Sequence, residues 1–160
     1  MTLYENEDEP RLKLLVNPSW VFFGSLVMGY LLRLVFGVRL PLPRAFAEGL
    51  GELIVLVAIW FAIGAFGAFS EQAESAEPGA PTRALVTAGP YKRSRNPMYL
   101  AMLLFGAGLA IATTNFWMLM TTAIAAPLLH VFAVLPEERY LEARFGADYA
   151  AYKASVRRWL

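Results

Sequence analysis

Four long apolar segments constrain the fold of this 160-residue chain more than any other feature. They cover approximately residues 18–38, 46–69, 98–113 and 116–135. About 20 apolar residues in a helix cross the hydrocarbon core of a bilayer, where a helix satisfies its own backbone hydrogen bonds. Hydrophobic residues make up 58% of the chain, above the roughly 45–50% of ordinary soluble domains. The sequence therefore predicts an all-α integral membrane protein, a single membrane domain with four transmembrane helices.

The third and fourth apolar segments are separated only by the turn of residues 113–115, so we expect them to form an antiparallel helical hairpin. Pro127 lies inside the fourth segment and predicts a kink, because proline lacks an N–H and its ring clashes with the preceding turn. In the second segment, Gly49, Gly64 and Gly67 are positions where we expect a neighbouring helix to come close.

The last 25 residues, 136–160, are mixed in polarity and predict a C-terminal amphipathic helix on the cytoplasmic side. Helical spacing extends from Pro136 to Lys153, with an expected break at Gly146. We expect this helix to lie on the membrane surface or to fold back over the loop of residues 83–99. The residues that can share its apolar face are Tyr140, Leu141, Phe145, Tyr149 and Tyr152.

The distribution of positive charge predicts the orientation in the membrane. Of the 14 Lys and Arg residues, only Arg33, Arg39 and Arg44 lie on the side that holds the link between the first two spans. The others lie in the N-terminal segment, the central loop and the tail. Because Lys and Arg are enriched in cytoplasmic loops, both termini and the central loop are expected in the cytoplasm, with the chain integral to the cytoplasmic membrane.

Composition excludes several kinds of chemistry. The chain has no cysteine, which removes disulfides, thiolate metal sites and cysteine nucleophiles. It has a single histidine, His130, so no metal centre is expected. A net charge of +1 gives no sign of a nucleic-acid partner.

The stretch from Leu85 to Tyr99, LVTAGPYKRSRNPMY, concentrates the polar features that lie between the apolar runs. Gly89-Pro90 predicts a turn, and Asn96-Pro97 predicts a helix start with Asn96 as N-cap. The cations Lys92, Arg93 and Arg95 fall between these two breaks. A positive patch beside a helix N-terminus suits an anionic or zwitterionic small molecule. The alternative is a cytoplasmic loop whose charges only orient the flanking helices.

Two adjacent acids, Glu137 and Glu138, follow the fourth apolar segment directly. Carboxylates beside a membrane are costly unless they hold a cationic group or contact water. The alternative is that they favour the start of the tail helix, since acids stabilise a first turn and Pro136 precedes them.

Together these motifs resemble the isoprenylcysteine carboxyl methyltransferase family, part of a wider group of small membrane methyltransferases that includes phospholipid N-methyltransferases. The resemblance covers about residues 80–160. The positions that carry it, in order, are Leu85, Val86, Gly89, Tyr91, Arg95, Pro97, Tyr99, Glu137, Glu138, Leu141, Phe145, Gly146, Tyr149 and Tyr152.

The resemblance implies S-adenosyl-L-methionine as cofactor, held on the cytoplasmic side, and a lipophilic small molecule or lipid as methyl acceptor. A carboxylate attracts the sulfonium and ammonium groups of this cofactor, and tyrosines offer faces for its adenosine. The residues that the resemblance assigns to the cofactor are Arg83, Ala84, Leu85, Val86, Gly89, Tyr91, Asn96, Pro97, Met98, Tyr99, Glu137 and Glu138.

The chain departs from the family pattern at three positions. Asn96 replaces a histidine, Ala101 replaces a glycine, and Ala133 replaces an arginine that binds the carboxylate of a prenylcysteine substrate. His130, one turn before Ala133, is the candidate base, and Arg95 is a candidate cation for the reaction. An amine or other lipophilic acceptor is therefore favoured. Prenylcysteine carboxyl methylation and a non-catalytic membrane protein with the same fold are the alternatives.

Overall fold

The computed structural model describes residues 17–71 and 84–160, and in these ranges it is helical, without strands. The expected all-α membrane architecture is confirmed. The α-helices are α1 (Pro18–Phe36), α2 (Arg44–Glu71), α3 (Pro97–Ala112), α4 (Phe116–Leu129) and α5 (Leu135–Ser155). A 3₁₀ turn, η1 (Gly89–Lys92), precedes α3, and a π-helical turn, η2 (His130–Val134), joins α4 to α5.

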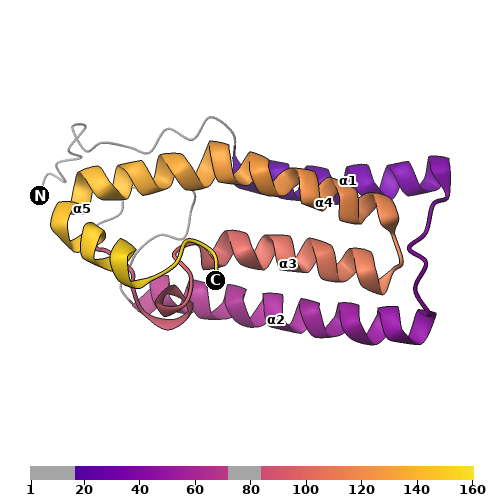
Figure 1. Ribbon diagram of the computed structural model, residues 1–160, viewed down its shortest axis with the longest axis horizontal. Helices are drawn as coiled ribbons and strands as arrows, with labels where there is room; N and C mark the ends of the chain where they lie inside the picture. The colour runs from indigo at the N-terminus through magenta and orange to yellow at the C-terminus, as the bar shows by residue number, and fades with distance from the viewer. Residues whose placement is uncertain (1–16, 72–83) are drawn as a thin grey trace, which may run out of the picture.

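The bundle consists of two packed pairs of helices (Figure 1). Helix α2 packs on α3, α1 packs on α4, and α3 also packs on α4. The expected hairpin is present: Asn115 caps α4 by accepting a hydrogen bond from the Met118 N–H at 3.1 Å. The α1–α2 link and this hairpin turn lie at one end of the bundle, while η1, the far part of α5 and the C-terminus lie at the other.

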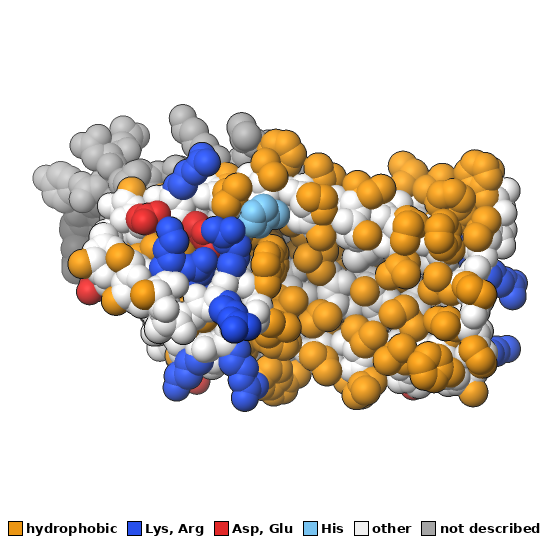
Figure 2. Space-filling view, viewed as in Figure 1, with side chains coloured by type: hydrophobic (Ala, Val, Ile, Leu, Met, Phe, Trp, Pro, Cys, Tyr) orange, Lys and Arg blue, Asp and Glu red, His pale blue; other side chains and the backbone are white. Residues whose placement is uncertain are grey.

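The outer surface of the bundle is apolar, as a lipid-facing surface must be (Figure 2). Large side chains such as Trp20, Val35 and Ile63 are 77%, 74% and 68% exposed. Helices α1, α2 and the continuous stretch Phe116–Ser155 are long and apolar enough to cross a membrane. Helix α3 is apolar but has 16 residues, about 24 Å at 1.5 Å per residue, so it is the short member of the four expected spans.

Helices α2 and α3 approach each other closely at two glycines. A Cβ atom on Gly51 would lie 2.4 Å from the backbone nitrogen of Ala112, and one on Gly108 would lie 2.9 Å from the Gly51 oxygen. The sequence expectation was wrong for Gly49 and Gly67, where a Cβ atom would meet nothing within 4 Å. The contact is set by how α2 is rotated against α3, which the positions of glycines in one helix do not reveal.

The fourth apolar segment and the tail form one continuous helical path. Three residues after Pro127 the α-helix widens into η2, and α5 then follows without a break. The predicted boundary between the fourth apolar segment, to residue 135, and the tail helix, from residue 136, is therefore not a break in the helix. Helix α5 extends beyond the bundle and reverses at Gly146, whose φ of 49° and ψ of −116° confirm the predicted break.

After this reversal the chain returns toward the bundle, which agrees with the expectation that the tail folds back over the loop (Figure 1). The predicted apolar face of the tail is fully buried only in its returning part. Tyr149 is 1% exposed and Tyr152 is 8% exposed, whereas Tyr140, Leu141 and Phe145 are half-buried. The tail is thus a cap on one end of the bundle.

Candidate functional site

The loop before α3 is fixed by η1 and by one buried tyrosine. Gly89 has a φ of 56°, which glycine adopts without strain, and the predicted Gly89-Pro90 turn is confirmed. Tyr91 is buried in a cluster with Ala65, Ala68 and Val86. Its carbonyl oxygen accepts a 2.7 Å hydrogen bond from the Tyr152 hydroxyl, so the loop is joined directly to the returning part of α5.

Asn96 occupies the N-cap position of α3, and Pro97 begins the helix as predicted. The expected capping hydrogen bond is absent, however, because the Asn96 side chain makes no bond to the first turn. Its amide nitrogen donates instead to the carbonyl oxygen of Arg158, at 3.1 Å. The asparagine at this position therefore holds the C-terminal segment rather than the helix that it begins.

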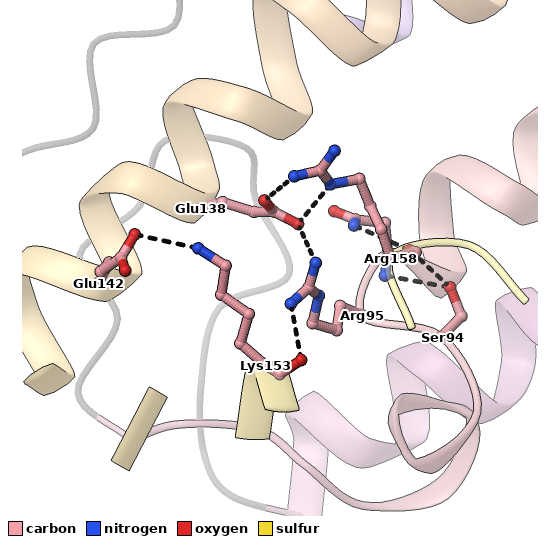
Figure 3. A network of polar contacts seen from close by, with 7 residues as sticks. Ser94, Arg95, Glu138, Glu142, Lys153 and Arg158 are labelled. Carbon is pink, nitrogen blue, oxygen red and sulfur yellow. Dashed lines mark hydrogen bonds and ion pairs between the residues drawn. The ribbon is translucent and has the colours of Figure 1, made fainter. Parts of the chain in front are cut away.

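Glu138 is the centre of an ion-pair cluster that holds three segments together (Figure 3). Its carboxylate lies 3.1 Å from Nη2 of Arg95 and accepts hydrogen bonds from Nε and Nη2 of Arg158 at 3.0 and 2.9 Å. The side chains of Arg95 and Glu138 are each only 7% exposed. Burial alone would raise the pKa of the Glu138 carboxyl, but the bonds from Arg158 and the charges of both arginines outweigh it and lower that pKa.

Backbone carbonyls complete the attachment of the C-terminal segment. The Arg95 N–H donates to Arg157 O at 2.9 Å, and its guanidinium donates to Lys153 O at 3.3 Å. The Ser94 hydroxyl donates to Arg158 O at 3.2 Å. Sequence reasoning missed Ser94 and Arg158. The run Arg157-Arg158-Trp159 after a predicted helix was the available signal, but nothing in it specified a return to the loop.

Glu137 has a different environment from its neighbour. It accepts a 3.0 Å hydrogen bond from the Tyr99 hydroxyl, and no cation pairs with it among the residues that the structure describes. Burial raises the pKa of the Glu137 carboxyl, and the adjacent Glu138 charge raises it further, against the lowering effect of the Tyr99 bond. Burial, with the charge of Glu137, also raises the pKa of the Tyr91 hydroxyl. The site thus contains one uncompensated acid beside two tyrosines.

His130 begins η2 and lies against the C-terminal segment. Its ring centre is 6.2 Å from that of Trp159, and within the described ranges its buried Nδ1 has no hydrogen-bond partner. Trp159 also packs against the buried cluster that contains Tyr99 and Ala133. The position where the resemblance expected an arginine is therefore filled by apolar contacts.

The structure brings most of the sequence-predicted residues to this end of the bundle. Val86, Tyr91 and Met98 pack together, and Tyr99 contacts Glu137. Ala84 and Leu85 are partly buried just before them. Arg83 lies outside the described residues.

We expect the two adjacent acids to affect stability in opposite directions. Because the pKa of Glu138 is lowered on folding, its charge stabilises the fold above the ordinary carboxyl pKa of about 4.3, and that stability is lost as the pH falls. The raised pKa of Glu137 has the reverse effect, so its charge weakens the fold at neutral pH. Glu138→Gln should lower the free energy of unfolding by about 2 kcal/mol, whereas Glu137→Gln should raise it.

Thermal unfolding in detergent at pH 7, without ligand, measures both effects. Glu142→Gln is the matched control, because Glu142 makes one exposed ion pair with Lys153 at 3.4 Å and should change little. A Glu137→Gln protein less stable than the parent, or a Glu138→Gln protein as stable as it, would contradict this interpretation.

Comparison with known proteins places the chain in a family. A family model described as phospholipid methyltransferase matches residues 46–148, well over half of the chain. An uncharacterised protein from Haemophilus influenzae is 36% identical over 63 residues, which are 39% of this chain and the whole of that protein. No solved structure matches. The resemblance drawn from the motifs is confirmed for the wider group, and the chain belongs to the phospholipid methyltransferase family of membrane methyltransferases.

Proposed function

We propose that this protein transfers a methyl group from S-adenosyl-L-methionine to a lipophilic acceptor at the membrane. The observation that carries the proposal is the carboxylate of Glu137, which is partly buried, bonded to Tyr99 and without a cationic partner in the described part of the chain. It lies within the motif residues that define the family resemblance. A buried acid without a cation destabilises a protein unless a ligand supplies the missing charge.

The residues at the site fit this cofactor chemically. Its sulfonium and ammonium groups are both cations that a desolvated carboxylate attracts strongly, because the interaction is screened less than in water. Tyr91 and Tyr99 lie near the acid, and aromatic side chains of this kind suit contact with an adenosine group. Glu138 is already neutralised by two arginines, so we assign the cofactor's positive charge to Glu137 alone. When bound, the cofactor would supply an electrophilic methyl group.

The protein's own contribution is alignment and exclusion of water, as a direct displacement requires. The Tyr99 hydroxyl orients the Glu137 carboxylate. The cluster of Glu138 with Arg95 and Arg158 holds the C-terminal segment over the loop, and Tyr152 fixes the backbone at Tyr91. Arg95 was a candidate for contact with substrate; its pairing with Glu138 favours a positioning role instead.

Glu137→Gln is the direct test of the cofactor assignment. The substitution keeps shape and hydrogen bonding but removes the charge, so we expect at least about a tenfold loss of affinity for S-adenosylmethionine, roughly 1.4 kcal/mol. Isothermal titration calorimetry on purified protein measures the affinity, with Glu142→Gln as control. Equal affinity of Glu137→Gln and parent, in folded protein, would refute the assignment, and no binding by the parent would favour the non-catalytic alternative.

The surroundings of Ala133 bear on the acceptor. Ala133 is 1% exposed and packs with Tyr99 and Val134, and Trp159 covers this cluster. A substrate carboxylate would find no arginine at position 133, and both Arg95 and Arg158 are engaged by Glu138. An amine acceptor needs a base and no repelling cation. The buried Nδ1 of His130, which has no hydrogen-bond partner in the described ranges, is a candidate for that base. We therefore favour an amine or other neutral lipophilic acceptor that reaches the site from the bilayer.

Parallel methyl-incorporation assays on membranes should distinguish the acceptors. We expect transfer to phosphatidylethanolamine or another lipophilic amine to exceed ester formation on a farnesylcysteine analogue. His130→Ala should lower kcat for the amine by about 10²-fold or more, the usual range for loss of a general base. Efficient esterification of the farnesylcysteine analogue, with none of the amine, would favour the prenylcysteine alternative.

We propose that both termini and the site face the cytoplasm, because positive charge gathers at this end of a single membrane domain. The chain lacks cysteine, so single substitutions give clean labelling. Ser155→Cys should react with an impermeant maleimide only after cells are opened, whereas Thr113→Cys, exposed at the opposite end, should react in intact cells. The reverse pattern would invert the proposed orientation.

A further inference from the structure

A cavity of about 480 Å³ lies between the C-terminal half of α2 and η1. Two glycines of α2, Gly64 and Gly67, are among the residues that line it. At Gly64 a Cβ atom would lie 2.6 Å from Cγ of Pro90, so the absent side chain lets η1 rest against the helix. At Gly67 a Cβ atom would meet nothing within 4 Å, which leaves open space beside that contact.

Two cations line the cavity without a carboxylate partner in the described ranges. Lys92 and Arg93 are both exposed and form no ion pair there. The Arg93 guanidinium lies 5.5 Å from the ring centre of Trp60, so it is held over an aromatic face while its N–H donors stay available. Among the described residues that line the cavity, Glu71 is the one acid, so this described lining carries an excess of positive charge.

The cavity opens where the apolar surface of α2 meets the polar end of the molecule. Trp60, Ile63 and Phe66 are 52%, 68% and 53% exposed on this part of α2. Tryptophan is typical of the membrane–water interface, where lipid headgroups lie. Figure 2 shows a cluster of Lys and Arg side chains toward one end of the molecule, directly beside the edge of the apolar surface, and a few more at the opposite end. The positive charge of the cavity and its position at the edge of the apolar surface both suit a headgroup phosphate.

We propose that this cavity binds the headgroup of an anionic bilayer phospholipid, with the phosphate on Lys92 and Arg93 and the acyl chains along the apolar face of α2. Two basic side chains at headgroup depth favour an anionic lipid over a zwitterionic one. The site does not rely on the proposed methyl transfer, and its lipid is a bound ligand, not the acceptor. Because η1 also carries Tyr91, an occupied cavity would hold the loop of the candidate site in place.

Native mass spectrometry of detergent-purified protein tests the site without any activity measurement. Phosphatidylglycerol and phosphatidylcholine are titrated separately, and the retained lipid per chain is compared. In the parent protein we expect preferential retention of phosphatidylglycerol. Lys92→Gln combined with Arg93→Gln should raise the concentration for half-saturation about thirtyfold, as expected for two cations near a membrane surface. The control, Arg39→Gln with Arg139→Gln, removes two exposed cations outside the cavity.

A second pair of variants tests whether filling the cavity with a side chain prevents lipid binding. Gly67→Leu should fill it without a backbone clash and reduce retention, whereas Gly49→Leu, equally open but at the far end of α2, should not. Equal retention of phosphatidylglycerol by the parent and the Lys92/Arg93 double variant would overturn the proposal. So would equal retention of both lipids by the parent, or displacement of phosphatidylglycerol by equimolar inorganic phosphate, which would indicate a site for free anions.

Discussion

The polar end of this membrane protein depends on the buried carboxylate of Glu138. Helix α5 supplies the acid, the loop before α3 supplies Arg95, and the C-terminal segment supplies Arg158. Breaking a buried pair by removing one partner leaves an uncompensated charge, which is why such a cluster fixes the segments that contribute to it. Through it, parts of the chain far apart in sequence form one cap over the bundle.

The neighbouring acid owes its distinct character to this arrangement. Glu138 is neutralised by two arginines, which leaves Glu137 next to it with a tyrosine hydroxyl as its only partner in the described structure. One acid therefore stabilises the cap, while the other lowers stability and is available for a positive ligand. Adjacent residues in a family motif thus serve different purposes, which a motif alone does not distinguish.

Sequence reasoning predicted the features that depend on local chemistry. Apolar length predicted the helices, Gly89-Pro90 the turn, Pro97 the start of α3 and Gly146 the reversal of the tail. It failed where the outcome depends on tertiary contacts. The Asn96 side chain donates a hydrogen bond to the Arg158 carbonyl instead of capping its own helix. The close contact of α2 with α3 is at Gly51, not at Gly49. The pairing of Arg158 with Glu138 and the packing of Trp159 were missed, because long-range pairing of a C-terminal segment leaves no periodic signal.

The central claim is that Glu137 must be ionised to hold a positive ligand, and the pH dependence of cofactor binding tests it most directly. Since burial raises the pKa of Glu137, a bound cation must displace its proton over the range in which this carboxyl titrates. Calorimetric titration of S-adenosylmethionine at several pH values should show affinity rising with pH in the parent and a smaller rise in Glu137→Gln. The same rise in both proteins would contradict the account.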